Sequence, residues 1–506
     1  MINSFIAMLN PSILIFLTIG VIVGMVVGAL PGLSATMAIA ILTPLTFWLA
    51  PEQGFAVLIG IYNSAIFAGG ISAILINTPG TPASIASSFD GYSMTKQGKG
   101  GLALGINVIY SVLGGLISTL VLSIFSFPLA NLAMKFGAPE YFSLAIFGLA
   151  LMASVSGGEP LKGLIMGTLG MMLATVGMDP ISGIQRYTFQ NINLIDGISF
   201  VPIMIGVFGI GEVLVQIYDE FSNKINSKEV GEIGRIFPTK EEIKKTIPGS
   251  LFAGIVSPII GAIPGAGGDI ASIICWDQAK RMSKEPEKFG SGSVEGLAAT
   301  CLANNGVIGG ALTTMLTLGI PGDSVTAILI GALMMYGMIP GPKLFVENPS
   351  FIYGMISLMI LANLCILLIG LLGAKASSKI LSVKKEYIWS TVLIFSVIGS
   401  YSLQNSYFDV LIVVISGLIG FIFRKMNFPL GPFILGILLG KLAESNLRRA
   451  LLISDGSYSI FITKPISLFL IVITFIIVIT PVIKSLKKST KKIENLEYNI
   501  ETKVIK

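Results

Sequence analysis

The chain has 506 residues, of which 53% are hydrophobic and only 12% are charged, and its mean hydropathy is +0.85. This composition excludes an ordinary soluble domain. Several apolar stretches reach the ~20 residues that cross a hydrocarbon core, which predicts a polytopic α-helical membrane protein. The net charge of +6 comes from loops and the tail, where orientation signals and anionic lipid explain it, so no nucleic-acid partner is expected.

The first half contains two interrupted apolar stretches. The first runs from Ile13 to Leu30, breaks at Pro31-Gly32 and resumes from Ser34 to Ala50; it lacks the basic start of a cleavable signal peptide, so we expect it to be retained. The second, Phe55 to Ile76, carries Asn63 at mid-depth and breaks over residues 77–82. Irregular backbone is tolerated in lipid only where protein buries it or where it lines a wet cavity, so each break predicts a binding site.

The second half repeats this pattern after a charged stretch, Asp219 to Thr246, that joins the halves. An apolar segment from Pro248 breaks at Pro264-Gly265, and a helix carrying Asn304 and Asn305 breaks over residues 319–324. The other expected spans cover residues 102–125, 141–155, 161–176, 198–217, 351–373, 387–403, 407–423, 428–442 and 466–483.

The two halves also match in spacing. Residues 28–32 read Gly-Ala-Leu-Pro-Gly and residues 261–265 read Gly-Ala-Ile-Pro-Gly. Three positions of the first half recur in the second at one offset: Asn63, Pro79-Gly80 and Ser84 correspond to Asn305, Pro321-Gly322 and Thr326. Interrupted helices at corresponding positions of two halves are typical of transporters with internal repeats and point to the binding site.

The positive-inside rule orients these segments. With the basic loops, the linker and the tail in the cytoplasm, Pro248 to Trp276 must enter and leave on one side, as a hairpin with Pro264-Gly265 near its tip. The first segment becomes a hairpin entered from outside, with the N-terminus outside and the C-terminus in the cytoplasm. The predicted fold is all-α and polytopic, with two inverted repeats, each holding a re-entrant hairpin and a Pro-Gly-broken helix, plus about eight or nine full spans.

The predicted division of the chain follows from the linker and the tail. It comprises a first membrane repeat over residues 1–218, a cytoplasmic linker over 219–247, a second, inverted repeat over 248–463, an additional span over 464–485 and a basic cytoplasmic tail over 486–506.

Each half-helix that starts after a break presents unpaired N–H groups and about half a positive charge, so several starts together would bind an anion without a buried lysine. The expected substrate-binding residues lie at these starts: Pro31, Gly32, Ser34, Thr36, Thr78, Gly80, Thr81, Ser84, Gly265, Gly267, Gly322, Ser324 and Thr326. Carbonyl ends and nearby amides or carboxylates suit a coupling cation such as sodium, and these candidates are Asn63, Asn77, Asp269, Asn304, Asn305 and Asp323. For Asp269 and Asp323, helix capping alone is the alternative.

Other classes of function lack their characteristic residues in this sequence. A phosphate-binding Gly-x4-Gly-Lys-Ser/Thr loop, a Gly-x-Ser-x-Gly elbow and any histidine-based metal site are missing, so we expect no catalytic residues, no enzyme activity and no cofactor besides sodium. The three cysteines fit small buried hydrophobic residues. An anion channel, or a membrane scaffold in which the breaks only bend helices, is the alternative to an ion-coupled transporter.

Four stretches carry a resemblance to a known family: residues 28–36, residues 77–82 with Asp90-Gly91-Tyr92, residues 261–267 and residues 319–322. They resemble the large membrane subunit, the permease, of the tripartite tricarboxylate transporter family, over nearly the whole chain except the basic tail. The resemblance implies secondary active import of di- or tricarboxylates such as citrate across the bacterial inner membrane, driven by a sodium or proton gradient. It also implies two protein partners, a small four-helix membrane subunit and an extracytoplasmic solute-binding protein; a homodimer stays open.

Overall fold

The computed structural model describes residues 2–30, 32–155, 160–179, 181–222, 234–373 and 385–480. Within these ranges the fold is all-α, as predicted, apart from one antiparallel pair of two-residue strands, β1 (Gly177–Met178) and β2 (Gln185–Arg186). Eight helices there are long and apolar enough to cross a membrane, which confirms a polytopic membrane protein. Pro31, the basic tail and the basic loop before residue 385 lie outside the described residues.

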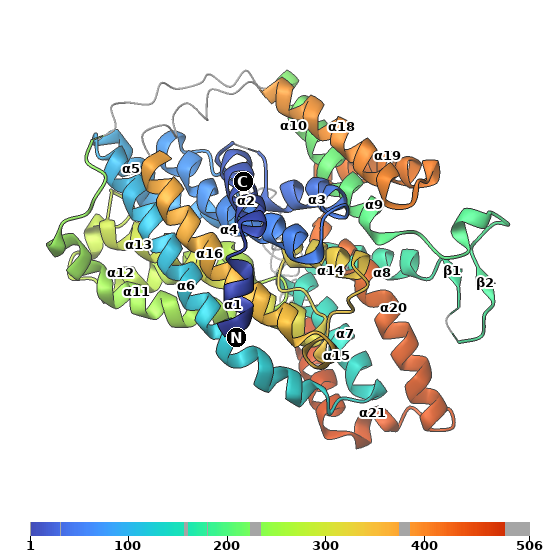
Figure 1. Ribbon diagram of the computed structural model, residues 1–506. Helices are drawn as coiled ribbons and strands as arrows, with labels where there is room; N and C mark the ends of the chain where they lie inside the picture. Colours follow the sequence, from blue (N-terminus) through green and yellow to red (C-terminus); the bar gives the residue numbers. More distant parts are fainter. Residues whose placement is uncertain are drawn as a thin grey trace, which may run out of the picture. The chain divides into compact units, whose positions relative to one another are not determined.

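The described helices divide into two compact units, one from residues 2–135 and 199–427 and one from residues 136–198 and 428–480. Figure 1 labels most of the helices of both units. Both units draw on both halves of the chain, so the proposed repeat boundaries remain a prediction. The smaller unit contains, besides the strands, α7 (Ala138–Val155), α8 (Pro160–Ala174), η2 (Ile192–Leu194), α20 (Leu430–Ile453), α21 (Ile460–Thr463) and a helix over Pro465–Thr480.

The larger unit holds all four breaks. Its elements are α1 (Ile2–Met8), α2 (Pro11–Ala29), α3 (Ala35–Thr46), α4 (Pro51–Ile76), η1 (Pro82–Ser84), α5 (Ile85–Lys96), α6 (Gly100–Ala133), α9 (Phe200–Met204), the π-helix η3 (Ile205–Ile210), α10 (Gly211–Ser222), α11 (Lys240–Gly261), α12 (Gly267–Met282), η4 (Pro286–Lys288), α13 (Val294–Leu318), α14 (Ser324–Met335), α15 (Pro342–Glu347), α16 (Pro349–Gly373), α18 (Lys385–Gln404) and α19 (Tyr407–Lys425).

The helix ends fall where the breaks were predicted. The interruption between α2 and α3 includes Gly32, whose φ of 87° is left-handed, and Ser34 caps α3 by accepting the N–H of Met37 at 3.1 Å. Asn77 caps the C-terminus of α4, with a left-handed φ of 57°. Glycine and asparagine adopt this conformation more readily than other residues, which explains the residue types at both positions.

The second half repeats these dihedral angles. Gly265 has a φ of 82°, like Gly32, and Gly319 caps the C-terminus of α13 with a φ of 70°, like Asn77. Asp323 then caps α14, since its Oδ1 accepts the N–H of Thr326 at 2.8 Å. The Pro-Gly breaks therefore stop and restart helices in both halves, while the inversion of the halves across a membrane remains a prediction.

Several boundaries differ from the expectation: α6 and α20 run on to Ala133 and Ile453, beyond the predicted residues 125 and 442, and α3 ends at Thr46. Helix α11 starts at Lys240, not at Pro248, because Thr239 and Glu242 form a capping box in which the Glu242 carboxylate accepts the Thr239 N–H at 2.6 Å. The last residues of the charged stretch, Lys240 to Thr246, therefore form the first turns of α11. The apolar pattern does not indicate the π-helix η3, which interrupts the helix over residues 200–222.

Helices α4 and α13 form the centre of the larger unit. Each is buried over 94% of its most apolar window, whereas α19 is buried over only 28%. Protein, not lipid, therefore surrounds the polar side chains of α4 and α13, as a site inside a membrane requires.

Candidate functional site

The first two breaks pack against each other through glycine. A side-chain carbon on Gly80 would overlap the carbonyl oxygen of Gly28, and one on Gly28 would overlap the carbonyl of Ala65 in α4. The Gly80 N–H donates to the carbonyl of Gly69 at 3.2 Å. The hairpin of α2 and α3 therefore touches the break after α4 backbone to backbone, which only glycine permits.

The third and fourth breaks make the same contacts at the corresponding positions. A carbon on Gly322 would overlap the carbonyl oxygen of Gly261, and one on Gly261 would overlap the carbonyl of Val307 in α13. In this pair the Gly265 N–H also donates to the Gly322 carbonyl at 2.7 Å. The two break pairs are thus copies of one backbone arrangement.

Contacts between the halves bring the pairs together. Helix α12, which follows the third break, packs on η1 after the second, where Ser272 Oγ donates to the Ala83 carbonyl at 3.0 Å. Helix α3, after the first break, packs on α14 after the fourth. Tyr62 of α4 donates its hydroxyl to Asp323 Oδ2 at 2.5 Å. All four half-helix starts therefore belong to one contiguous region.

Several predicted substrate-binding hydroxyls serve as local caps. Ser34 caps α3, Thr326 is bonded to Asp323, and Ser84 Oγ donates to the Thr81 carbonyl at 2.8 Å. Thr36 and Ser324 are half-buried, and neither hydroxyl bonds to another group within the described ranges. These two remain the best placed side chains for a ligand.

The other predicted substrate-binding residues, mostly glycines, also differ in how accessible they are to a ligand. Gly80 and Gly322 are packed against protein, so their role is close approach. Thr78 is exposed, and the Gly32 carbonyl accepts the Gln216 side chain at 2.5 Å. Gly265 and Gly267 are half-buried, with left-handed φ values of 82° and 26°.

The predicted asparagines meet where α4 crosses α13. Asn305 Nδ2 donates to the Asn63 carbonyl at 3.0 Å, and Asn304 Nδ2 donates to the Ile66 carbonyl at 3.4 Å. Asn363 of α16, which sequence reasoning missed, donates to Asn63 Oδ1 at 3.3 Å. The side-chain oxygens of Asn304, Asn305 and Asn363 are buried and have no donor among the described residues. Unpaired buried oxygens are suited to a cation or to water.

The acidic candidates lie beside this crossing. Asp269 is in the first turn of α12, within electrostatic range of Asp323. The Asn304 oxygen faces Gly268, next to Asp269, at 3.1 Å from where a side-chain carbon would be. Asn77, by contrast, is an exposed helix cap, so the structure does not bring it to this group.

Three more residues of the region had no distinct sequence signal. Tyr62 binds Asp323 from an apolar helix, and only its position next to Asn63 could have drawn attention to it. Gln216 donates to Gly32 and accepts the indole N–H of Trp389 at 2.8 Å. Gln216 and Trp389 come from helices far along the chain, which sequence spacing alone does not connect.

Asp90, part of the family motif, is a structural anchor. Its buried carboxylate accepts the indole N–H of Trp276 at 2.7 Å and the backbone N–H groups of Gly290, Gly292 and Ser293 at 2.8, 3.1 and 2.7 Å. It thereby fastens α5 to the loop that precedes α13.

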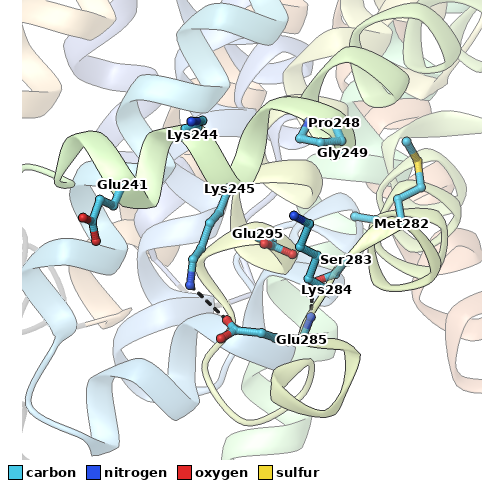
Figure 2. A pocket seen from close by; sticks show the side chains of 11 residues that line it. Glu241, Lys244, Lys245, Pro248, Gly249, Met282, Ser283, Lys284, Glu285 and Glu295 are labelled. Atoms are coloured by element: carbon cyan, nitrogen blue, oxygen red, sulfur yellow. Dashed lines mark hydrogen bonds and ion pairs between the residues drawn. The ribbon is translucent and has the colours of Figure 1, made fainter.

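A large cavity lies away from the breaks, at the base of the hairpin of α11 and α12. It has a volume of about 560 Å³, and Figure 2 shows Lys245 of α11 reaching across it to Glu285, with an ion pair of 3.1 Å. Lys244, Lys284 and Glu295 also line it. Its lining contains both lysines and glutamates and lies at the charged end of the hairpin. It is therefore distinct from the predicted carboxylate site at the breaks.

The fold and site define a polytopic helical membrane protein with paired interrupted helices, the architecture of secondary transporters. Residues 14–435 match the tripartite tricarboxylate transporter TctA family, and the chain belongs to that family. Proteins of this family are permeases that work with a small membrane subunit and a binding protein.

Two relatives come from Agrobacterium vitis. An uncharacterised 52.8 kDa protein in the TAR-I ttuC' 3' region is 36% identical over 486 residues, covering 96% of both chains. An uncharacterised protein in the TAR-II ttuC' 3' region is 33% identical over 235 residues, covering 46% of this chain and 97% of the relative. No solved structure matches.

Proposed function

We propose that this chain is the permease subunit of a secondary active transporter that imports a di- or tricarboxylate, such as citrate, across the bacterial inner membrane. A sodium or proton gradient drives the import. The observation that carries the proposal is the doubled break pair, in which Gly80 packs on Gly28 and Gly322 packs on Gly261. If the two copies lie in inverted repeats, the transporter can open the shared site to either side of the membrane by equivalent movements.

The anion-binding part of the proposal rests on the half-helix starts. Helices α3, α12 and α14 and the η1–α5 segment all begin at breaks, and each start offers N–H groups to an anion. Thr36 and Ser324 add half-buried hydroxyl groups that bond to no other residue in the described part of the chain. A carboxylate would therefore be held by backbone dipoles and hydroxyls, without a lysine or arginine.

The coupling cation is proposed to bind on the other side of the same region. The Asn304 side-chain oxygen has no donor among the described residues and lies beside Gly268. Asp269 and Asp323 contribute negative charge. Oxygen ligands and two carboxylates attract a cation, and the cation in turn reduces the repulsion between the carboxylates. Asn63 and Asn305 hold the crossing of α4 and α13 that positions Asn304.

The proposal includes the two protein partners of the family. An extracytoplasmic binding protein delivers the carboxylate, and a small four-helix membrane subunit completes the complex. The outer loops after α3 and α14 and the strand-bearing loop between α8 and α9 are the proposed contact regions.

The test is uptake of radiolabelled citrate, and of a panel of other di- and tricarboxylates, into liposomes that contain the chain with both partners. Ion gradients are imposed one at a time. Uptake of a carboxylate that needs a sodium or proton gradient supports the proposal. Ionic currents, or carboxylate flux indifferent to every gradient, would instead support the anion channel, and no flux of any carboxylate would favour a scaffold.

A further inference from the structure

Asp409 is a buried carboxyl group in the first turn of α19, with an exposed fraction of only 4%. Its backbone N–H donates to Ser406 Oγ at 3.3 Å, which fixes the helix start. Its carboxylate oxygen Oδ2, however, is buried and has no donor among the described residues. A lone carboxylate in such a place is costly unless a donor, a cation or a proton neutralises it.

Asp409 also lines a cavity of about 310 Å³ within the larger unit. The walls come from the ends of α3, α14 and α18 and from the start of α9, and they are mostly apolar: Phe47, Phe200, Val201, Met334, Met335 and Leu403 belong to them. Ser199 and Gln404 are the polar lining residues besides Asp409. A metal ion held by a protein collects several oxygen ligands, and this wall offers few, so a proton is the better neutralising partner.

A line of polar residues continues from the cavity along α18. Ser396, Ser400 and Gln404 are spaced four residues apart and therefore share one face of that helix. The hydroxyls of Ser396 and Ser400 are buried without a partner in the described parts of the chain, and Ser396 Oγ lies beside Gly209 of the π-helix η3. Buried hydroxyls of this kind are usual binding places for water. π-helical turns often occur at functional sites.

Most charged and titratable groups on the surrounding described helices bond elsewhere, and Glu386 and Tyr387 lie at the opposite end of α18 from the cavity. Arg424 and Lys425, at the far end of α19, pair with Glu212 and Asp219. Tyr336 donates to the Thr46 carbonyl, and the rings of Tyr401 and Tyr407 pack on each other at 5.2 Å. None of these residues lines the cavity, so among its described lining residues Asp409 is the titratable group.

We propose that Asp409 is a proton-binding site that is loaded through this cavity, with water along Ser400 and Ser396 extending the path inward. The carboxylate takes one proton from a hydronium ion in the cavity: one O–H bond of the hydronium breaks as the carboxyl O–H bond forms, and a water molecule is left. Release to a water molecule reverses the step. This site is separate from the cation site proposed near Asp269 and Asp323, and it stands whether or not the substrate is a carboxylate.

The first test is pH-difference infrared spectroscopy on the purified full-length chain. We expect a carboxylic-acid C=O band that Asp409→Asn removes and Asp409→Glu moves, while Glu52→Gln, which changes an exposed carboxyl group, leaves it unchanged. If Asp409→Asn does not fold, the Asp409→Glu shift alone decides. A difference spectrum unaffected by the Asp409 variants would overturn the proposal, and so would a band that responds to sodium at constant pH.

The second test uses liposomes containing the chain with its partners. An acid-outside gradient should raise uptake by the wild type and not by Asp409→Asn, whereas a sodium gradient should act on both alike. An equal response of both proteins to the pH gradient contradicts the proposal. If neither protein transports any carboxylate, the proposed transport function fails, while the infrared titration still judges Asp409.

Discussion

In the first break pair Gly80 packs on Gly28, and in the second Gly322 packs on Gly261, yet the side chains around the two pairs differ. The first pair has no acidic residue, and the Gln216 side chain holds its tip at Gly32. The second carries Asp269 and Asp323 and closes on itself through the bond from Gly265 to Gly322.

The comparison separates two roles: the shared glycines allow close packing, and the differing side chains are proposed to bind different ligands. Close packing of backbone at a break requires glycine, and both pairs keep it at the same positions. The side chains that follow the breaks differ, and only the second pair carries Asp269 and Asp323, the negative charges that the proposed coupling cation would need. We therefore expect substitutions at the shared glycines to act alike, and substitutions at the differing side chains to act on one pair only.

The largest effect is expected from Gly80→Ala and Gly322→Ala. In each variant the new methyl group overlaps a backbone carbonyl that cannot move aside, so we expect a loss of about 3 kcal/mol or more in the free energy of unfolding. Thermal unfolding of the purified protein measures it. Gly167→Ala is the matched control, because its methyl group would lie 3.7 Å or more from the nearest described atoms, at ordinary van der Waals distance. If only one of the two glycines is sensitive, the pairs are not copies.

Asp90→Asn should come next. The carboxylate of Asp90 accepts four hydrogen bonds, and an amide NH₂ would face some of those donors, so we expect a loss of about 2 kcal/mol in stability. The corresponding position of the second half is Ala332, which has no such anchor. Ala332→Ser as a control should therefore change stability far less, and equal losses in both variants would argue against an anchor confined to the first half.

Asp323→Asn separates charge from capping. Asparagine caps a helix as well as aspartate does, so stability should change little, while the lost negative charge should reduce ion-driven uptake by roughly tenfold, or about 1.4 kcal/mol. The measurement is initial uptake rate against sodium or proton concentration. Tyr62→Phe, which keeps the charge, serves as the comparison. Unchanged uptake in Asp323→Asn would leave capping as the whole role of this residue.

The smallest effect is expected from Gln216→Leu. It removes the bond to the Gly32 carbonyl and the acceptor for Trp389, which should cost about 1 kcal/mol locally. Hydrogen exchange followed by mass spectrometry should show faster exchange over residues 28–36 and no change over residues 261–268, which act as an internal control. Equal changes in both segments would mean that Gln216 supports the whole unit and not one break.

The sequence predicted the breaks well, because proline, glycine and asparagine leave strong local signals. The left-handed residues Gly32, Gly265 and Gly319 all lie inside predicted breaks. Helix α11 was predicted to start too late, because the prediction followed the apolar residues from Pro248 on. The actual start is set by the capping box at Thr239 and Glu242.

The side-chain surroundings of the breaks were harder to predict. Tyr62, Gln216 and Asn363 reach the site from helices that tertiary packing alone brings near it. Conversely, Ser34, Ser84 and Thr326 look like ligands by position, but the structure uses their hydroxyls as caps. Hydroxyl residues at helix starts favour capping for general reasons, so position after a break does not separate the two roles.

The central claim is that the half-helix starts of both break pairs bind one carboxylate. It is tested most directly by the thermal stability of the purified chain with citrate and a panel of di- and tricarboxylates, each with and without sodium. A ligand that binds the folded state raises its apparent stability. We expect a carboxylate-dependent rise in the unfolding temperature that both Thr36→Val and Ser324→Ala reduce. A rise that neither variant affects would place the carboxylate elsewhere and contradict the account.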